Sequence, residues 1–101
     1  MKHAERQAYF ARIDKLRQQV MDGKSPAYTL GSEDVNYNFK FIGELLGIPA
    51  SQACAAFLMK HVLRAIAETR GITHPEGRDG LIADLQNYVG ILGSILEEEN
   101  R

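Results

Sequence analysis

Apolar residues recur at helical spacing along this chain, and no segment alternates apolar and polar residues as a strand requires. Glycine and proline divide the chain into four such segments. Because short connections between long amphipathic helices favour antiparallel neighbours, the pattern predicts an all-α fold, a compact bundle of about four helices. A chain of 101 residues can build one hydrophobic core, so we expect residues 1–101 to form a single all-α domain.

The breakers set the expected limits of the helices, which are about 3–21, 32–47, 50–70 and from 79 to the acidic tail at 97–101. Asp22-Gly23 is expected to end the first helix, and Ser32 to cap the second. The apolar stripe of the first helix is narrow and consists of Tyr9, Ile13, Leu16 and Val20. The first helix is therefore a candidate for packing on a partner subunit.

The third and fourth predicted helices each offer an apolar side for the core. On the third we expect these residues to face inward: Ala55, Leu58, Met59, Val62, Ala65 and Ile66. Its opposite side carries Phe57, Lys60, His61, Arg64 and Glu68. On the fourth we expect an inward stripe of Leu81, Ile82, Leu85, Tyr88, Val89, Leu92 and Leu96.

Charge and composition narrow the possible functions. Twelve Lys and Arg against thirteen Asp and Glu give a net charge of −1, which argues against a general nucleic-acid binder. No apolar run approaches the roughly 18 residues that span a bilayer, and the charged start lacks a signal core, so we expect a cytoplasmic protein. The single Cys54 fits a reducing compartment, and we expect a small buried apolar residue rather than a reactive thiol.

Polar residues fall where the helical pattern predicts burial. Asn38 lies within the apolar arc of the second helix, which contains Val35, Phe39, Ile42, Leu45 and Leu46. On the fourth helix Asp84, Asn87 and Tyr88 share a face with Ile91. A buried carboxylate or amide without a partner costs several kcal/mol, so we expect Lys60 or Arg64 to meet Asn38 and Asp84 in a hydrogen-bonded cluster.

Two interpretations of this cluster remain open. It is either a structural network that fixes the register of the helices, or a ligand pocket. In a pocket, Lys and Arg would bind phosphate or another anion, while Asn and Asp would read the edge of a base or sugar. The candidate ligand-binding residues are Asn38, Lys60, His61, Arg64, Asp84, Asn87 and Tyr88.

Two loop residues are further candidates. Tyr28 could stack on a base, cover the pocket or plug the edge of the core, and Arg78 could bind an anion, pair with Asp79 or face water. The three histidines, His3, His61 and His74, have neither i, i+4 spacing nor a nearby cysteine, so we expect no metal site from them. The chain also lacks the short motifs of the common phosphate-binding and catalytic loops, so no catalytic residue is proposed.

The order of four short motifs resembles that of small all-α phage and prophage proteins of unknown function. The motifs are NF at 38–39, KH at 60–61, EGRDG at 76–80 and DLQNY at 84–88. The chain is also distantly similar, over about residues 31–98, to MazG-type nucleotide pyrophosphohydrolases and to nucleotide-modification-associated domains of phages. This resemblance implies a nucleotide ligand, and a phage protein of this kind would suit the sequestration of a defence signal.

The chain departs from the MazG pattern at the metal site. Those enzymes hold Mg²⁺ with paired carboxylates on neighbouring helices, whereas this chain offers only Glu44, Glu68 and Asp84, with Asn87 one turn after Asp84. We therefore expect non-enzymatic binding of a nucleotide or nucleotide-derived signal, with no cofactor. The alternatives are a diverged Mg²⁺-dependent nucleoside triphosphate pyrophosphohydrolase and a protein-interaction module that inhibits a host complex. In each case we expect a homo-oligomer without membrane association.

Overall fold

The regular structure of the described residues is helical. A computed structural model describes the backbone of residues 1–28 and 31–100 and the side chains of residues 1–22 and 31–100. This part contains four helices and no strand: α1 (His3–Tyr28), α2 (Tyr37–Leu46), α3 (Ala50–Thr69) and α4 (Gly77–Glu99). The all-α bundle predicted from the sequence is confirmed.

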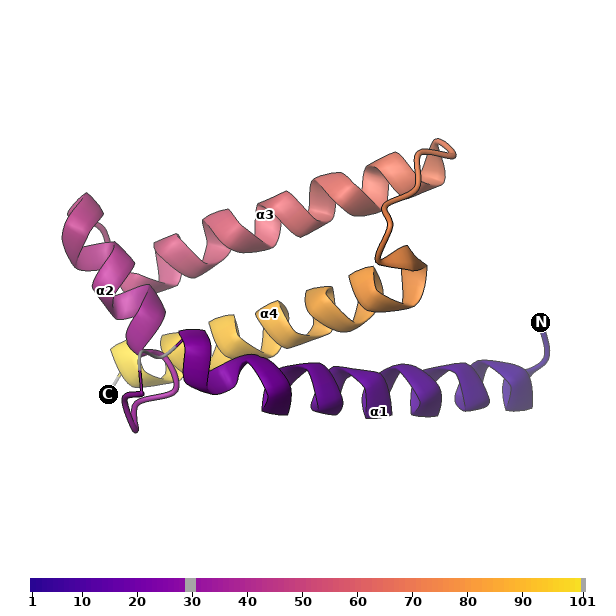
Figure 1. The fold of residues 1–101 in the computed structure, drawn as a ribbon, viewed down its shortest axis with the longest axis horizontal. Coiled ribbons are helices and arrows are strands. Elements are labelled where there is room, and N and C mark those ends of the chain that lie inside the picture. Colours follow the sequence, from indigo (N-terminus) through magenta and orange to yellow (C-terminus); the bar gives the residue numbers. More distant parts are fainter. Residues whose placement is uncertain (29–30, 101) are drawn as a thin grey trace.

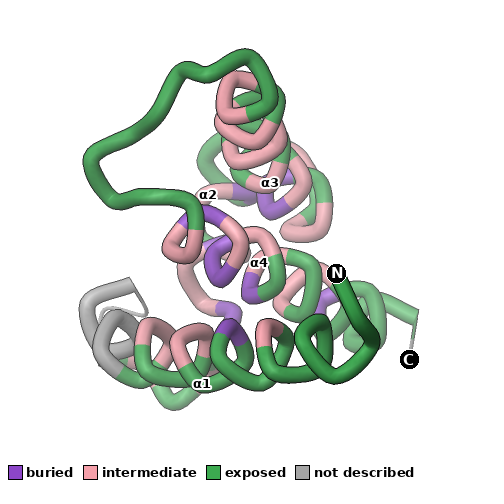
Figure 2. Tube along the Cα trace, turned by 90° about the vertical axis from the view of Figure 1, so that its right-hand side faces the viewer, coloured by how far each residue is buried: buried purple, intermediate pink, exposed green. Residues whose placement is uncertain are grey.

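Helix α4 lies in the middle of the bundle. Figure 1 shows α1 along one side of α4, α3 along the other, and α2 crossing the end at which α4 finishes, and α4 contacts both long helices. Helices α3 and α4 run in opposite directions, as expected, while α1 runs in the same direction as α4. The view along the bundle in Figure 2 shows the same three layers, with the outer side of α1 exposed. Helix α1 thus packs on α4 of its own chain.

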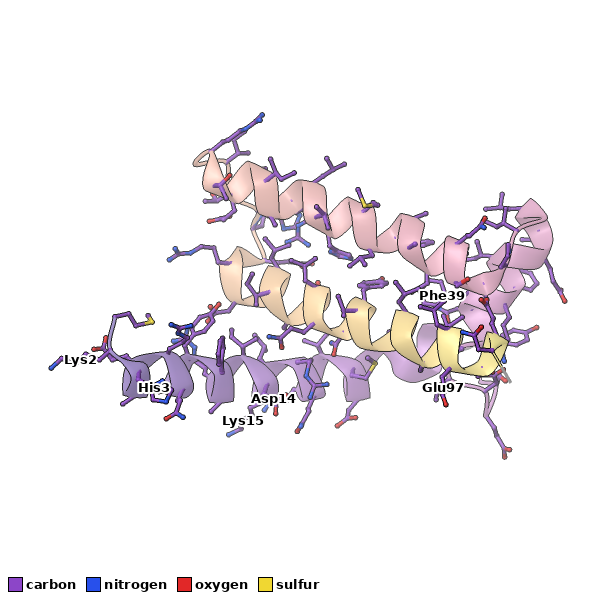
Figure 3. The ribbon with its side chains drawn as sticks, turned by 180° about the vertical axis from the view of Figure 1, so that it is seen from behind. Lys2, His3, Asp14, Lys15, Phe39 and Glu97 are labelled. Atoms are coloured by element: carbon purple, nitrogen blue, oxygen red, sulfur yellow. The ribbon has the colours of Figure 1, made fainter. Side chains whose placement is uncertain are left out.

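The hydrophobic core lies where α2, α3 and α4 meet. Its buried residues are Phe39, Ala53, Cys54 and Ile95. Figure 3 shows Phe39 reaching from α2 toward α4, whereas Lys15 lies on the side of α1 that faces away from the bundle. Helix α1 contributes one fully buried side chain to the described part of the fold, that of Ile13. Leu81 and Ala83, toward the start of α4, are also buried but lie outside this cluster.

Two glycines end helices in the way the sequence predicts. Gly47 has φ +69°, and the N–H groups of Gly47 and Ile48 donate to the carbonyls of Glu44 and Gly43. Gly71 repeats this hydrogen-bonding pattern after α3, with φ +78°. Both helix ends have the Schellman arrangement, in which a left-handed residue lets the last carbonyls find donors.

Two predicted helix boundaries are wrong. Helix α1 continues through Gly23 and Pro26 to Tyr28, since a glycine costs a helix about 1 kcal/mol and a proline about 3 kcal/mol without forbidding helical backbone. Helix α2 begins at Tyr37 rather than after Ser32. The Ser32 hydroxyl instead accepts from the N–H of Asp34, a local turn bond that competes with helix formation.

The predicted inward faces are also partly wrong. Met59 and Ile66 of α3 are exposed, and the side that carries His61 and Arg64 faces α4. On α4, Val89 and Leu96 are exposed. The expected arc of the second helix fails likewise at Val35, Leu45 and Leu46, which are all exposed. The reason is that α3 carries apolar residues on both sides, and α4 is covered from two sides, so neither has a single inward stripe.

Candidate functional site

A pocket of about 370 Å³ opens between the helices. This volume lies at the lower end of the range of small-molecule sites. All seven predicted ligand-binding residues line it. Its full lining comes from all four helices and from the connections before α2 and after α3, and consists of Val20, Met21, Val35, Asn38, Phe39, Phe57, Lys60, His61, Arg64, His74, Glu76, Asp84, Asn87, Tyr88 and Ile91.

Helical spacing brings the polar residues together. Lys60 and Arg64 lie one turn apart on α3, and Asp84 and Asn87 lie one turn apart on the facing side of α4. Asp84 and Asn87 are buried, and Arg64 is partly buried. Asn38 reaches the same space from α2. The amide in the apolar arc therefore lies at a pocket rather than in a closed core.

The Arg64 guanidinium has partners on only one of its edges. Its Nη1 lies 3.6 Å from Oε2 of Glu76 and 4.0 Å from Oδ2 of Asp84. Its Nε and Nη2 are buried and have no hydrogen-bond partner among the residues that the structure describes. The Nε–H and Nη2–H groups point the same way and form the fork that binds two oxygens of a carboxylate or phosphate. The fork is thus available to an anion.

His61 is held against an aromatic ring. Its imidazole centroid lies 4.6 Å from that of Tyr88, with 31° between the ring planes. Desolvation lowers the pKa of His61 below its usual 6.5, and the nearby Asp84 opposes this shift in part. His61 is therefore neutral near pH 7, and its buried Nδ1 finds no partner within the described part of the chain.

Asn87 joins the pocket to α1. Its Nδ2 donates to the backbone carbonyl of Arg17 at 3.1 Å, which fixes the amide with Oδ1 as the remaining acceptor. That Oδ1 is buried, and no donor within the described residues reaches it. A ligand with an N–H or O–H group would supply the missing hydrogen bond.

The unpaired buried atoms converge on this one place. In the described side chains, the buried nitrogen and oxygen atoms without a partner belong to His61, Arg64 and Asn87, and all three residues line the pocket. Each such atom carries a free-energy cost of about 1–3 kcal/mol unless something satisfies it. Their concentration indicates a site built to receive polar atoms from elsewhere.

The predicted hydrogen-bonded cluster does not form as expected. Arg64 and Asp84 are 4.0 Å apart, which is longer than a hydrogen bond, and Lys60 is exposed. The polar side chains therefore surround a space instead of satisfying one another. The alternative of a closed register-fixing network loses its main support.

The two predicted loop contacts have different outcomes. Arg78 lies outside the pocket, where its Nε is 3.8 Å from Oε1 of Glu68, and it lines a second hollow of about 510 Å³. Its expected neighbour Asp79 pairs instead with Arg12 at 3.3 Å. Tyr28 is the last residue of α1, and its side chain lies outside the described residues.

Sequence reasoning missed two polar residues of the pocket. His74 and Glu76 come from the connection between α3 and α4, and His74 accepts a hydrogen bond through Nδ1 from the N–H of Glu76 at 3.1 Å. Their segment has no periodicity from which a facing direction could be predicted. The only sequence signal that could have placed this loop near Arg64 is the small number of residues between the end of α3 and the start of α4.

The described residues do not assemble a metal site. No group of three or more His, Cys, Asp or Glu side chains among them could hold an ion. Glu68 lines the second hollow and Asp84 the first, so the carboxylates that a hydrolase would need do not converge. Glu44 lines neither.

Cys54 behaves as a core residue. Its side chain is fully buried, and burial raises the pKa of its thiol to about 11. A thiol with this pKa is not ionised near pH 7 and is a poor nucleophile. The prediction of a buried apolar role is confirmed.

Within the described residues, no single helix is both long and apolar enough to span a membrane, and α2 and α3 meet this test only as a pair bent by 102°. No family model matches the chain, and neither a curated protein nor a solved structure is significantly similar to it. The resemblance to phage proteins and MazG-type enzymes therefore stays a prediction from the motifs.

Proposed function

We propose that this protein binds a nucleotide or nucleotide-derived signal in the pocket between α3 and α4, without hydrolysing it. The observation that carries the proposal is the unpartnered fork of Arg64, which lies in one pocket with the unpartnered Oδ1 of Asn87. A nucleotide combines the two groups that these atoms require, since its phosphate accepts hydrogen bonds and its base or sugar donates them.

The remaining lining supports a ligand with a flat ring. The ring of Tyr88 contacts both His61 and Phe39, and Phe57 contacts Phe39 at 5.7 Å between centroids. An aromatic wall beside a polar wall is the surface that a base and its phosphate need, because bases stack on such rings. Lys60, exposed at the rim, adds a positive charge for the phosphate.

Thermal melting tests the proposal. Purified protein is melted with nucleoside mono- and triphosphates, dinucleotides, cyclic oligonucleotides and ADP-ribose derivatives, each with and without Mg²⁺. A ligand at about 100 times its dissociation constant adds roughly 2.7 kcal/mol to the free energy of unfolding. We expect a shift in Tm that needs no Mg²⁺. A shift that requires Mg²⁺ would favour the hydrolase alternative, and the absence of any shift would remove the nucleotide proposal.

The wider biological setting rests on the sequence alone. A phage origin and the sequestration of a defence signal are proposals from the motif resemblance, and a cytoplasmic location is a proposal from the pattern of apolar and charged residues. The alternative of a protein-interaction module has one structural feature in its favour, the exposed apolar residues of α2 and α3, for which a second copy of the chain is considered in the Discussion.

A further inference from the structure

The charges that face the pocket balance one another. Lys60 and Arg64 supply two positive charges, and Glu76 and Asp84 supply two negative ones. His61 is neutral near pH 7 because desolvation lowers its pKa. His74 accepts a hydrogen bond through Nδ1 from the N–H of Glu76. The pocket therefore has no net positive charge to offer to a chain of several phosphates.

The distribution of these charges is uneven around Arg64. Both carboxylates lie on the Nη1 side of the guanidinium, at 3.6 and 4.0 Å, while the buried fork on the other edge has no partner among the described residues. One phosphate can bind the fork with two of its oxygens. Further phosphates would bring more negative charge into a pocket that already contains the carboxylates of Glu76 and Asp84.

We propose that the pocket selects a ligand with a singly charged phosphodiester, such as a cyclic mononucleotide, over the polyphosphate chain of a nucleoside triphosphate. This inference rests on the proposed function and adds the class of the ligand. A phosphodiester keeps one negative charge and two unesterified oxygens, which match the one open fork. A triphosphate brings several negative charges into a space without net positive charge, and the described residues offer no cluster of His, Cys, Asp or Glu that could hold Mg²⁺ to offset them.

Calorimetric titration with two sets of probes tests this selection. The first set is the 3′,5′-cyclic monophosphates of adenosine, guanosine, cytidine and uridine, and the second is the four corresponding triphosphates, all with a chelator to remove Mg²⁺. We expect at least one cyclic nucleotide to bind on the order of tenfold or more tightly than the triphosphate with the same base.

A charge variant makes the test specific to the pocket. Glu76→Gln removes one of the two carboxylates from a side chain that is 55% exposed, so the fold should tolerate it. It should raise the affinity for the triphosphate severalfold more than that for the cyclic nucleotide. Glu97→Gln makes the same charge change near the end of α4, outside the pocket lining (Figure 3), and should leave the ratio unchanged.

The outcomes separate the inference from the function on which it rests. Tighter or equal binding of the triphosphate by the unmodified protein would overturn the charge selection while leaving nucleotide binding intact. An equal effect of Glu76→Gln on both probes would also overturn it. No binding of either set by the protein or by Glu76→Gln would overturn the selection, and the nucleotide proposal would be removed only if the full melting panel also gave no shift.

Discussion

At the scale of single residues, Arg64 meets two different environments. One edge of its guanidinium faces two carboxylates at 3.6 and 4.0 Å, and the other has no partner in the described part of the chain. The two carboxylates balance the positive charge of Arg64, so the fold tolerates this partly buried residue. The hydrogen bonds that Nε and Nη2 could donate are left for a ligand. Charge and hydrogen bonding can be separated by substitution.

Arg64→Lys makes that separation. Lysine keeps the charge opposite Glu76 and Asp84 but cannot form a planar fork with two parallel donors. We expect a change of less than about 1 kcal/mol in the free energy of unfolding and a loss of about tenfold or more in nucleotide affinity. Chemical denaturation and calorimetric titration measure the two effects. Arg12→Lys, at an exposed ion pair outside the pocket, is the matched control and should keep full affinity. Undiminished binding by Arg64→Lys would mean that the fork is not used.

Much of the residue set could be predicted from the sequence. The i, i+3, i+4 spacing of Asp84, Asn87 and Tyr88 indicated one shared face, and all three line the pocket. The hydrogen bond from Asn87 to the carbonyl of Arg17 could not be predicted, because it joins residues far apart in the sequence. His74 and Glu76 were missed because a loop gives no facing direction.

At the scale of helices, the start of α2 is fastened to the end of α4. Glu98 accepts hydrogen bonds from Nδ2 of Asn36 at 2.6 Å and from Nζ of Lys40 at 2.8 Å, and Lys40 also binds Asp34. Glu99 accepts from the N–H of Ser51 in the first turn of α3, where a negative charge is favourable. The acidic residues Glu98 and Glu99 at the end of α4 therefore hold two other helices in place.

This attachment predicts a pH dependence of stability. The bond to Lys40 is the main cause that lowers the pKa of Asp34 and of Glu98, from usual values of 3.8 and 4.5. A carboxylate whose pKa is lower in the folded state stabilises the fold above its unfolded pKa, and the gain is lost as the pH falls through the folded value. The contribution should be complete above about pH 5 and vanish in more acidic solution.

Urea unfolding at pH 7 and pH 3 checks this dependence. Glu98→Gln should lower stability at pH 7 and have a smaller effect at pH 3, because the stabilisation by the carboxylate is lost as the pH falls through its lowered pKa. Glu97→Gln has the same change in charge without these contacts and serves as the control. A loss of stability at pH 3 as large as that at pH 7 would contradict the role given to the Glu98 carboxylate.

A pair of glycines tests the packing of α2 against the turn that follows it. A Cβ at Gly43 would lie 2.6 Å from the carbonyl oxygen of Ile48, whereas a Cβ at Gly93 of α4 would have nothing within 4 Å. We expect Gly43→Ala to destabilise the protein by about 1–3 kcal/mol and Gly93→Ala to stabilise it by up to about 1 kcal/mol. Chemical denaturation of both variants measures the difference. Equal effects would show that the turn after α2 can move away from Gly43.

The facing directions of the helices were harder to predict than their existence. On α3, the apolar residues Met59 and Ile66 are exposed, whereas the charged Arg64 faces α4. The periodicity of the sequence locates the apolar sides of a helix. It cannot tell which side faces the core when a helix has more than one. The choice depends on what the facing helix offers, here the carboxylate of Asp84.

At the scale of the whole molecule, the outer side of α3 is left uncovered. Met59, Leu63 and Ile66 are 56%, 64% and 44% exposed. Their spacing of four and then three residues is that of the apolar positions in a coiled coil. Leu45 of α2 is exposed as well. An antiparallel second copy would bring Leu63 of one chain onto Met59 of the other, so the same stripe covers itself. We therefore assign the predicted homo-oligomer contact to α3.

Sedimentation velocity tests this assignment. The unmodified protein should sediment as a dimer or larger, and Leu63→Glu should produce a monomer that keeps its helical content by circular dichroism. Val89→Glu places the same charge at an exposed apolar position of α4 and should leave the assembly intact. A monomer at all concentrations, or an oligomer that survives Leu63→Glu, would rule out this interface.

The pocket itself is a property of the whole arrangement, since all four helices contribute to its lining. We propose that a nucleotide binds at the atoms of Arg64 and Asn87 that have no partner among the described residues. Nuclear magnetic resonance of isotope-labelled protein, titrated with the tightest nucleotide of the melting panel, tests this claim most directly. We predict saturable shifts of the Arg64 Nε–H and of the backbone amides near His61, Asp84 and Asn87. Saturable shifts confined to other surfaces, with the Arg64 Nε–H unmoved, would contradict it.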